Sequence, residues 1–359
     1  MSIHIICIIT ESYGGMLQQS VCKYGVDRKQ VFKEAVYERF CPMSRSLVSR
    51  MSVDFFFIGQ GELRIGILTN KKQRYMLRIA VQSKGRLYDE TMELLGEAGI
   101  KLVAVKRTLL VPSRNFPVEL LFLRDDDIPE SVASGTADIG IVGLNEMMEK
   151  KKNVTLLRRL GFSKCRLSLA IPKRVDYNGL QWFNGKKIAT SYPVILGEFL
   201  KEKGIEADIH VISGSVEIAP GIGLADAIFD IVSSGSTLVS NNLVEVETVV
   251  DSEAVLIGGS QELSAEKREV LDELLFRIEA VKAADSKKYV LMNVPREKLD
   301  EVLDILPGIK SPTILPLADS SWCSVHSVVK EKQFWEISGK LKNAGAEGIL
   351  VLDIEKMIL

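Results

Sequence analysis

A serine- and glycine-rich segment in the second half of the chain has the composition of a phosphate-binding loop. Within residues 217–238, EIAPGIGLADAIFDIVSSGSTL, a predicted strand leads directly into Ser233-Ser234-Gly235-Ser236-Thr237. Backbone N–H groups, four hydroxyls and a glycine that permits close approach suit a phosphate group. A helix beginning at Thr237 or Leu238 would add its N-terminal N–H groups. Short loops of this composition are also common surface turns, so the segment alone leaves both interpretations open.

Two acidic residues precede this loop. We expect Asp226 on a short helix and Asp230 near the end of the strand. Carboxylates repel a phosphate unless they bind Mg²⁺ or accept hydrogen bonds from sugar hydroxyls. A ribose phosphate therefore explains the combination better than free phosphate does. Taken alone, either residue is more often a helix cap or a solvated side chain.

The composition excludes several function classes. Among 359 residues, 46 Lys and Arg balance 47 Asp and Glu, so no general positive field exists to hold nucleic acid. Hydrophobic residues make up 46% and charged residues 26%, as in an ordinary folded soluble protein, and the length suits two or three domains. Any anion site must therefore be local.

The cysteines, histidines and apolar runs favour a cytoplasmic protein. The cysteines are Cys7, Cys22, Cys41, Cys165 and Cys323, with no CxxC spacing, as is typical of a reducing compartment. Only three His are present, which argues against a multi-histidine metal site. The apolar run at residues 3–9 is far shorter than the roughly 18 residues that span a bilayer. No Lys or Arg precedes that run, so we expect neither a signal peptide nor a membrane anchor.

Alternating strands and helices must position the candidate residues. We predict strands at residues 77–81, 118–123, 138–142, 166–172 and 186–190, and helices at 87–98, 129–134 and 194–203. This order predicts a parallel α/β sheet that binds ligands at the carboxyl ends of its strands. The segment GLADAIFDIVSSG at 223–235 repeats the helix, strand and glycine-turn pattern of SGTADIGIVG at 134–143. The repeat predicts two similar halves facing one another across a cleft.

The last part of the chain has a different order of elements. We predict strands at 289–293, 313–317, 323–329 and 348–352, with helices at 295–306 and 332–344. This βαββαβ order is ferredoxin-like. A helix at 265–284, with apolar residues at helical spacing, connects it to the preceding part.

Residues 76–359 resemble the long form of ATP phosphoribosyltransferase, the first enzyme of histidine biosynthesis, in ordered blocks along their length. The blocks are LRIAVQSKGRL (77–87), LRDDDIPESVASGTADIGIVG (123–143), RLGFSKCRLSLAIP (159–172), GKKIATSYP (185–193), the 217–238 segment and SPTILPLA (311–318). The resemblance implies a Mg²⁺-dependent condensation of ATP with 5-phosphoribosyl 1-pyrophosphate, giving N1-(5-phosphoribosyl)-ATP and pyrophosphate. It also implies feedback inhibition by L-histidine and a homo-oligomer, a dimer or hexamer, without nucleic acid or membrane partners.

The implied reaction gives the candidate residues their roles. Attack by adenine N1 at ribose C1, as pyrophosphate leaves, develops oxocarbenium character, so positioning and charge stabilisation suffice without a nucleophile. We assign residues 233–237 to the ribose 5-phosphate, and Asp226 and Asp230 to ribose hydroxyls or Mg²⁺. Lys84 and Arg86, in the first strand-to-helix loop, are candidates for pyrophosphate or the ATP phosphates. The alternative for both is solubility of an exposed turn.

Four further residues are candidates for ATP or ribose contacts. Thr190 could hydrogen-bond adenine, and Tyr192 could stack on it or equally be a half-buried packing residue. Glu217 could contact ribose or orient the loop. Arg124 could contact a phosphate, beside an acidic run at 125–127 that suits a solvated helix start.

For the C-terminal domain the resemblance implies an ACT-like regulatory fold that binds histidine at a subunit interface. The candidate contacts lie at predicted strand ends and are Asn293, Ser311, Thr313, Leu315 and Ala318. Cys323 and His326 have i, i+3 spacing on a strand, which places them on opposite faces and argues against a shared metal ion.

The resemblance also implies a bilobed catalytic region like periplasmic binding proteins. We expect subdomain I at 76–175 plus 255–283, subdomain II at 176–254 and the regulatory domain at 284–359. Residues 1–75 have no family counterpart, and an over-extended start before Met76, a partner-binding segment or a lightly folded extension would each explain them. The alternative function is a non-catalytic bilobed solute-binding or amino-acid-sensing protein, since such proteins share the fold. A nucleic-acid-binding regulator would need a basic helix-turn-helix, and the sequence contains none that we can identify.

Overall fold

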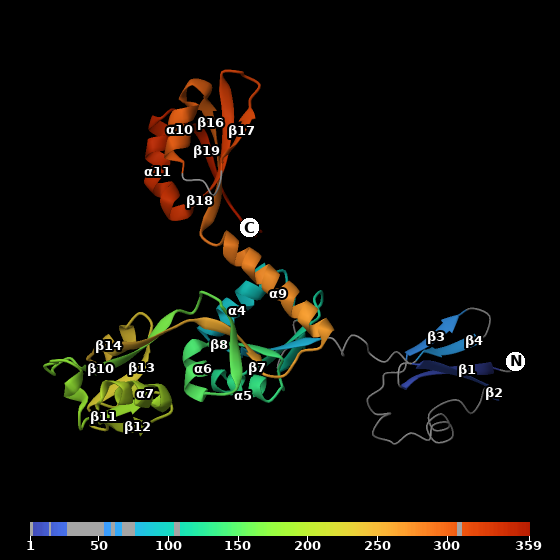
Figure 1. The fold of residues 1–359 in the computed structure, drawn as a ribbon, viewed down its shortest axis with the longest axis horizontal. Helices are drawn as coiled ribbons and strands as arrows, with labels where there is room; N and C mark the ends of the chain where they lie inside the picture. The colour runs from blue at the N-terminus through green and yellow to red at the C-terminus, as the bar shows by residue number, and fades with distance from the viewer. Residues whose placement is uncertain are drawn as a thin grey trace. The chain divides into compact units, whose positions relative to one another are not determined.

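The computed structural model describes residues 3–13, 16–26, 54–58, 62–66, 76–103, 108–306 and 311–359. The chain divides into two compact units, Met1–Met76 and Leu77–Leu359. In the described part of the first unit, strands form one sheet in the order β2-β1-β4-β3, blue in Figure 1. They are β1 (Ile3–Tyr13), β2 (Met16–Val26), β3 (Asp54–Ile58) and β4 (Glu62–Gly66).

The second unit begins with a lobe built on a six-stranded sheet, which we call the first lobe. Its strands are β5 (Leu77–Gln82), β6 (Leu110–Pro112), β7 (Val118–Leu123), β8 (Ile139–Gly143), β9 (Val154–Arg159) and β15 (Ala254–Gly259). Its helices are α4 (Arg86–Glu97), α5 (Ile128–Ala133), α6 (Leu144–Lys150) and α9 (Ala265–Ala284). The order is β6-β7-β5-β8-β15-β9, with β5 parallel to both β7 and β8.

Helices cover both faces of this sheet because its central strands are apolar on both sides. Ile79 of β5 packs in one core with α4 and α9, while the adjacent Ala80 packs in another with α5 and α6. Figure 1 shows these helix pairs on opposite sides of the sheet. The arrangement is the α/β layering predicted from the sequence.

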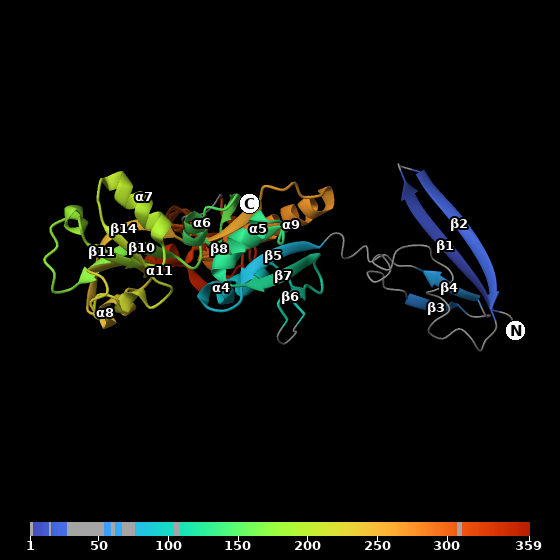
Figure 2. The same ribbon diagram turned by 90° about the horizontal axis from the view of Figure 1, so that it is seen from below.

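The second lobe is a five-stranded sheet with the order β12-β11-β13-β10-β14. Its strands are β10 (Cys165–Pro172), β11 (Lys187–Thr190), β12 (Asp208–Val211), β13 (Ala227–Val232) and β14 (Leu243–Ser252). Its helices are α7 (Pro193–Lys203) and α8 (Ser236–Ser240), with short 3₁₀ turns η2 (Leu180–Phe183) and η3 (Val216–Ile218). Figure 2 shows α7 and α8 on opposite faces of this sheet.

The expected boundary at residue 175 is wrong. The strand β10 pairs with β13 and β14 and so belongs to the second lobe, with the crossovers near residues 160–164 and 253. Leu167, Leu169 and Ile171 of β10 are fully buried against one face of that sheet, and Ala170 against the other. An apolar strand of this kind needs a central place in a sheet, but its sequence does not say which sheet provides it.

The C-terminal domain has the predicted βαββαβ order. Its elements are β16 (Lys287–Pro295), η4 (Arg296–Lys298), α10 (Leu299–Ile305), β17 (Thr313–Pro316), β18 (Trp322–Lys330), α11 (Glu331–Asn343) and β19 (Glu347–Asp353). The sheet order β17-β18-β16-β19 is that of a ferredoxin-like fold. Its core joins Val290 and Met292 of β16 to Val302 of α10 and Phe334 of α11.

The helix α9 leads into this domain over the residues predicted for it. Ser264 caps its N-terminus, with the Oγ accepting from the backbone N–H of Lys267. Within the described residues, no helix is long and apolar enough to cross a membrane.

Candidate active site

The serine- and glycine-rich loop leaves the carboxyl end of β13 and enters α8. Gly235 has φ 78°, a left-handed conformation that glycine adopts without strain. The helix α8 begins directly after it at Ser236, one residue before the first of the two predicted starts, Thr237 and Leu238. The hydroxyls of Ser234 and Ser236 lie 3.0 Å apart, and the side chains of Ser233, Ser234, Ser236 and Thr237 are exposed. The loop thus exposes four hydroxyls directly before and within the first turn of α8.

Arg86 connects this loop to the first lobe. It stands at the start of α4, and its Nη1 donates to the Oγ of Ser233 over 2.8 Å. Its Nη2 donates to the carbonyl of Lys164 in the crossover between the lobes, over 3.0 Å. The structure therefore brings a predicted cation together with the predicted phosphate loop. Lys84 is exposed in the same turn, two residues before Arg86.

Arg166 is a second cation beside the loop, and the sequence interpretation did not select it. Its Nη1 donates to the carbonyl of Ser233 over 3.2 Å, and its other nitrogens pair with the carboxylate of Glu245. The only signal in the sequence was its place in the block RLGFSKCRLSLAIP. Its proximity to the loop depends on antiparallel pairing of β10 with β13, in which Arg166 lies opposite Val232.

Asp230 lies within β13, three residues before the loop. Burial raises the pKa of its carboxyl to about 6, the hydrogen bond from the backbone N–H of Ile231 opposes this, and the nearby charge of Glu217 adds to it. Glu217 is partly exposed in η3. These two carboxyl groups are thus electrostatically coupled near the carboxyl half of the strand.

Asp226 does not lie with the loop, and its predicted helix is absent. It precedes β13 at the amino end, so the six-residue strand, about 20 Å long, separates it from Ser233. Its Oδ2 accepts from the backbone N–H of Lys187 over 2.9 Å, and its own N–H donates to the carbonyl of Lys187 over 2.8 Å. The residues before it form turns because Gly223 has φ 76°, which interrupts helical backbone.

Three residues of the ATSYP block are buried, Ala189, Thr190 and Tyr192. The Oγ1 of Thr190 accepts from the backbone N–H of Tyr192, and the Tyr192 hydroxyl donates to Glu146 over 2.9 Å. The Nδ2 of Asn145 donates to the same hydroxyl over 3.2 Å. Burial raises the pKa of Tyr192, and the neighbouring Glu146 carboxylate adds to this effect. Of the two interpretations weighed for Tyr192, packing fits this environment, because its ring has no open face for adenine.

Arg124 projects into solvent. Its Nε lies 3.4 Å from Oδ1 of Asp126, and residues 125–127 form a 3₁₀ turn, η1 (Asp125–Asp127), before α5. This matches the helix-start interpretation of the acidic run. Among the described residues, no three His, Cys, Asp or Glu side chains gather as a metal cluster would require.

The candidate histidine contacts lie largely on one face of the C-terminal sheet. Thr313 pairs with His326, and both Leu315 and Asn293 pair with Ser324, so the register puts all of them on the face opposite the helices. Ser311 and Ala318 are exposed just outside β17. Cys323 is buried in the core on the other face, as its spacing from His326 predicted.

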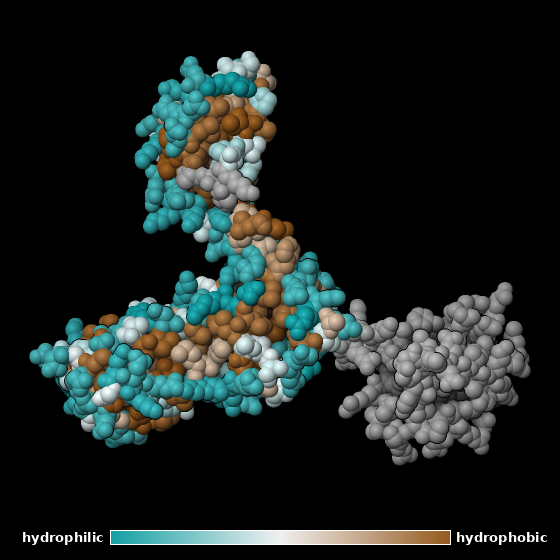
Figure 3. All heavy atoms as spheres, viewed as in Figure 1, coloured by the Kyte–Doolittle hydropathy of each residue, from teal (hydrophilic) through white to brown (hydrophobic). Residues whose placement is uncertain are grey.

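The same face combines a polar centre with apolar surroundings. The Nδ1 of His326 is 2.7 Å from the Tyr289 hydroxyl, and its Nε2 is 2.9 Å from the Oγ of Ser324. Leu315, Leu350 and Leu352 are exposed around it. Figure 3 shows an apolar area on this domain bordered by hydrophilic residues.

Comparison with known proteins finds matches across the lobes and the C-terminal domain. The sequence profile of the ATP phosphoribosyltransferase family (HisG) matches residues 124–280, and that of the HisG C-terminal domain matches 284–356. The chain is 70% identical over 284 residues to the ATP phosphoribosyltransferase of Bacteroides thetaiotaomicron, covering 79% of this chain and 100% of the relative. It is 58% identical over 283 residues to that of Cytophaga hutchinsonii, covering 79% and 99%.

Solved structures give more distant similarities. A chain of the ATP phosphoribosyl transferase (HisG:HisZ) complex from Thermotoga maritima is 28% identical with a TM-score of 0.49, over 57% of this chain and 99% of that one. The substrate-binding protein of an amino acid ABC transporter is 13% identical with a TM-score of 0.41, over 58% and 94%. The sequence relatives, which are matched over essentially their whole length, decide the assignment: the chain belongs to the ATP phosphoribosyltransferase family.

Proposed function

We propose that residues 233–237 bind the ribose 5-phosphate of 5-phosphoribosyl 1-pyrophosphate, and that Arg86 and Lys84 bind pyrophosphate or the ATP phosphates. As a family member the chain is a pentosyltransferase that condenses this compound with ATP in the first step of histidine biosynthesis. The non-catalytic binding-protein alternative is not favoured, because the sequence relatives carry the enzyme's name across both lobes and the C-terminal domain.

One observation carries the assignment: Arg86 of the first lobe donates to Ser233 of the second. The reaction needs a phosphate site and a cationic site within one substrate's length of each other, because 5-phosphoribosyl 1-pyrophosphate carries phosphate at one end and pyrophosphate at the other. Bringing adenine N1 to ribose C1 between them supplies proximity and orientation. Guanidinium and ammonium groups stabilise the negative charge that develops on the departing pyrophosphate.

Asp230 and Glu217 suit ribose hydroxyls and Mg²⁺. Mg²⁺ commonly binds one or two carboxylates together with substrate phosphates and water. The described residues contain no group of three or more candidate metal ligands, but the coupled pair Asp230 and Glu217 would be enough for such a site. A bound ion would neutralise charge on the pyrophosphate group. The carboxylate of Asp230, with a pKa of about 6, is ionised at neutral pH and ready to accept hydrogen bonds from ribose.

Three sequence candidates receive structural roles in place of substrate contacts, and a fourth keeps its role. Asp226 pairs with strand backbone, Thr190 accepts from the backbone of Tyr192, and Tyr192 is buried with its hydroxyl bonded to Glu146 of the first lobe. We therefore assign these three to the structure of the lobes. Arg124 remains a candidate for a phosphate contact from an exposed position.

Regulation and assembly complete the proposal. L-histidine would bind the open face of the C-terminal sheet beside Asn293, Thr313 and Leu315, with Ser311 and Ala318 at its margin. The exposed leucines of that face are suited to contact with another copy in a homo-oligomer, dimeric or hexameric. We also propose a cytoplasmic location and a regulatory domain at residues 284–359. The two catalytic lobes are divided at the crossovers near residues 160–164 and 253.

A matched pair of glycine variants tests the phosphate site. Gly235 and Gly185 both lie in the second lobe with positive φ, 78° and 69°, and neither has an atom closer than 4.0 Å to an added Cβ. Both G235A and G185A should therefore cost about 1 kcal/mol of stability. With the full chain, ATP, Mg²⁺ and pyrophosphatase, the ultraviolet absorbance of N1-alkylated adenine reports turnover. We expect only G235A to raise the KM for 5-phosphoribosyl 1-pyrophosphate, and equal KM values in both variants would contradict the assignment.

A further inference from the structure

Arg166 of β10 and Glu245 of β14 form an ion pair next to the proposed phosphate loop. The carboxylate of Glu245 accepts from two nitrogens of Arg166, from the Oγ of Ser168 over 2.7 Å and from the Oγ1 of Thr248 over 3.2 Å. Four donors therefore fix one carboxylate, and the bidentate pairing fixes the plane of the guanidinium. The remaining Nη1 of Arg166 points to the carbonyl oxygen of Ser233.

Holding that carbonyl orients the first N–H group of the loop. A trans peptide unit is planar, and its C=O and N–H point in opposite directions. Fixing the Ser233 carbonyl toward Arg166 therefore turns the N–H of Ser234 away from Arg166. The orientation of this peptide plane also affects the backbone N–H groups that come after it in the loop. The chain then passes through Gly235, whose left-handed conformation turns it into α8. The ion pair contacts the loop through the backbone carbonyl of Ser233, whereas Arg86 contacts the side-chain hydroxyl of the same residue.

We infer that Arg166 and Glu245 are a positioning pair, which sets the affinity for 5-phosphoribosyl 1-pyrophosphate by orienting the backbone of the phosphate loop. The inference rests on the proposed role of residues 233–237 as the ribose 5-phosphate site. Neither residue is assigned a contact with substrate. Their effect should be larger on 5-phosphoribosyl 1-pyrophosphate than on ATP, because the pair contacts the phosphate loop directly and reaches Arg86 of the β5–α4 turn only through Ser233.

Variants of Glu245 and Arg166 separate this role from general stability. E245Q removes the charge and one acceptor, and R166K keeps the charge but cannot form the bidentate geometry. Each should raise the KM for 5-phosphoribosyl 1-pyrophosphate about tenfold, the equivalent of one charged hydrogen bond. The KM for ATP should change less than twofold, and calorimetric titration of the full chain with ribose 5-phosphate should show the same loss of affinity.

The matched control is E247Q. Glu247 lies two residues away on β14, and its Oε1 accepts from the Tyr177 hydroxyl over 2.7 Å, outside the loop network. Its KM values should match those of the wild-type chain. If E245Q and R166K raise both KM values equally, or lower the melting temperature and leave both KM values at those of E247Q, the positioning role is wrong.

Comparison with the glycine variants distinguishes failure of the positioning role from failure of the phosphate site. A raised KM in G235A with unchanged E245Q and R166K overturns the positioning role and leaves the phosphate site standing. Unchanged KM values in all three variants overturn the phosphate site and the positioning role together.

Discussion

Asp226 holds the same structural position in the second lobe that Asp138 holds in the first. Asp226 exchanges two hydrogen bonds with the backbone of Lys187, through its Oδ2 and its N–H. Asp138 does the same with the backbone of Arg78, over 2.8 and 3.0 Å. Each aspartate precedes a strand and ties it to the parallel neighbour, β13 to β11 and β8 to β5. The repeat in the sequence is thus a repeat of a structural device.

This equivalence predicts that D226A is a stability variant. Losing the side-chain acceptor for the Lys187 N–H should lower the free energy of unfolding by about 1 to 2 kcal/mol. Where the variant is folded, kcat and both KM values should stay within twofold of wild type. Denaturant unfolding and steady-state kinetics on the same preparation check both parts. A folded D226A with turnover reduced a hundredfold would restore the catalytic role first expected for Asp226.

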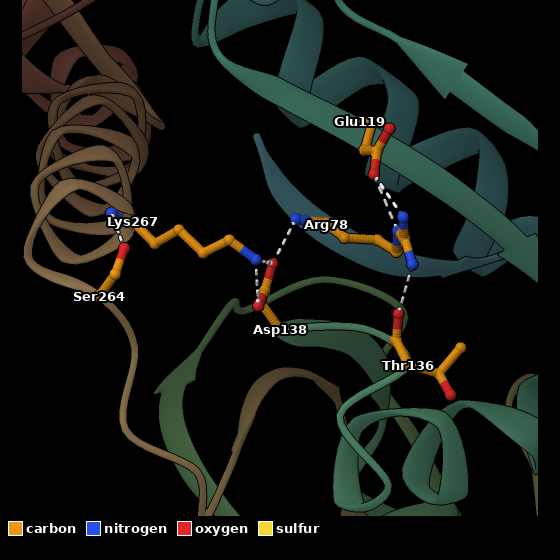
Figure 4. Close-up of polar contacts among 6 residues, drawn as sticks. All are labelled: Arg78, Glu119, Thr136, Asp138, Ser264 and Lys267. Carbon is orange, nitrogen blue, oxygen red and sulfur yellow. Dashed lines mark hydrogen bonds and ion pairs between the residues drawn. The ribbon is translucent and has the colours of Figure 1, made fainter. Parts of the chain in front are cut away.

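The comparator for D226A is D138A. Figure 4 shows Asp138 between the backbone of Arg78 and the ammonium group of Lys267 from α9, whose Nζ lies 2.7 and 2.8 Å from its oxygens. The partly buried ammonium loses its partner in D138A, so this variant should lose more stability than D226A does. We therefore expect D138A to lower the free energy of unfolding more than D226A does, because the carboxylate of Asp138 has more hydrogen-bond partners. A larger loss in D226A would contradict the equivalence of the two aspartates.

Arg86 should be the most sensitive of the predicted cations. R86Q removes the charge that faces Ser233 and should lower kcat/KM about a hundredfold, as loss of one preorganised charge-stabilising donor does. The matched control is R158Q, an exposed arginine of the first lobe whose Nε lies 3.3 Å from Glu279. Initial rates at saturating ATP and varied 5-phosphoribosyl 1-pyrophosphate measure both. Equal rates for R86Q and R158Q would remove Arg86 from the site.

The buried charge of Asp230 predicts a variant that is more stable but inactive. The fold raises the pKa of this carboxyl from 3.8 to about 6, so between these pH values the native protein binds its proton more tightly than the unfolded chain. Its contribution to the free energy of unfolding therefore falls as pH rises through this window. D230N should gain stability over wild type across the same window, by on the order of 3 kcal/mol above it.

Two measurements check the Asp230 prediction. Denaturant unfolding of the ligand-free chain from pH 4.5 to 8 should show the difference between D230N and wild type growing with pH. D272N, at an exposed position of α9, is the control and should show a constant difference. Turnover of D230N should be strongly reduced at neutral pH. A pH-independent difference in stability would contradict the burial of a charge at Asp230.

Local sequence patterns predicted most elements of the second unit, because each is a short apolar run bounded by glycine or polar turns. The helix predicted at 265–284 coincides with α9, and the strand at 118–123 coincides with β7. Contacts between segments far apart in the chain were harder to predict from the sequence. Arg166 meets Ser233 only through antiparallel pairing, and the hydroxyl of Tyr192 meets Glu146 of α6 only through the contact between the lobes. Pairing partners and contacts between lobes leave no local periodic signal.

Glu149 joins the two lobes and yields the last prediction. This buried residue of α6 accepts hydrogen bonds from the backbone N–H groups of Val194 and Ile195, both over 3.0 Å, at the N-terminus of α7. A helix N-terminus favours a carboxylate at this place. The contact therefore holds the second lobe to the first beside the Tyr192–Glu146 hydrogen bond.

E149A should affect stability and turnover together. It leaves N–H groups at the end of α7 without a partner, which costs about 1 to 3 kcal/mol, and it loosens the spacing of lobes that brings Arg86 to Ser233. We therefore expect kcat/KM to fall about tenfold even where the variant is fully folded, since small misplacements of substrate-positioning groups are costly. Glu198 provides the control, because it also links the lobes, through an ion pair with Lys151, but on the exposed surface, where such pairs contribute little. E198Q should match wild type in both measurements, and a folded E149A with wild-type kinetics would show that the catalytic geometry does not depend on this lobe contact.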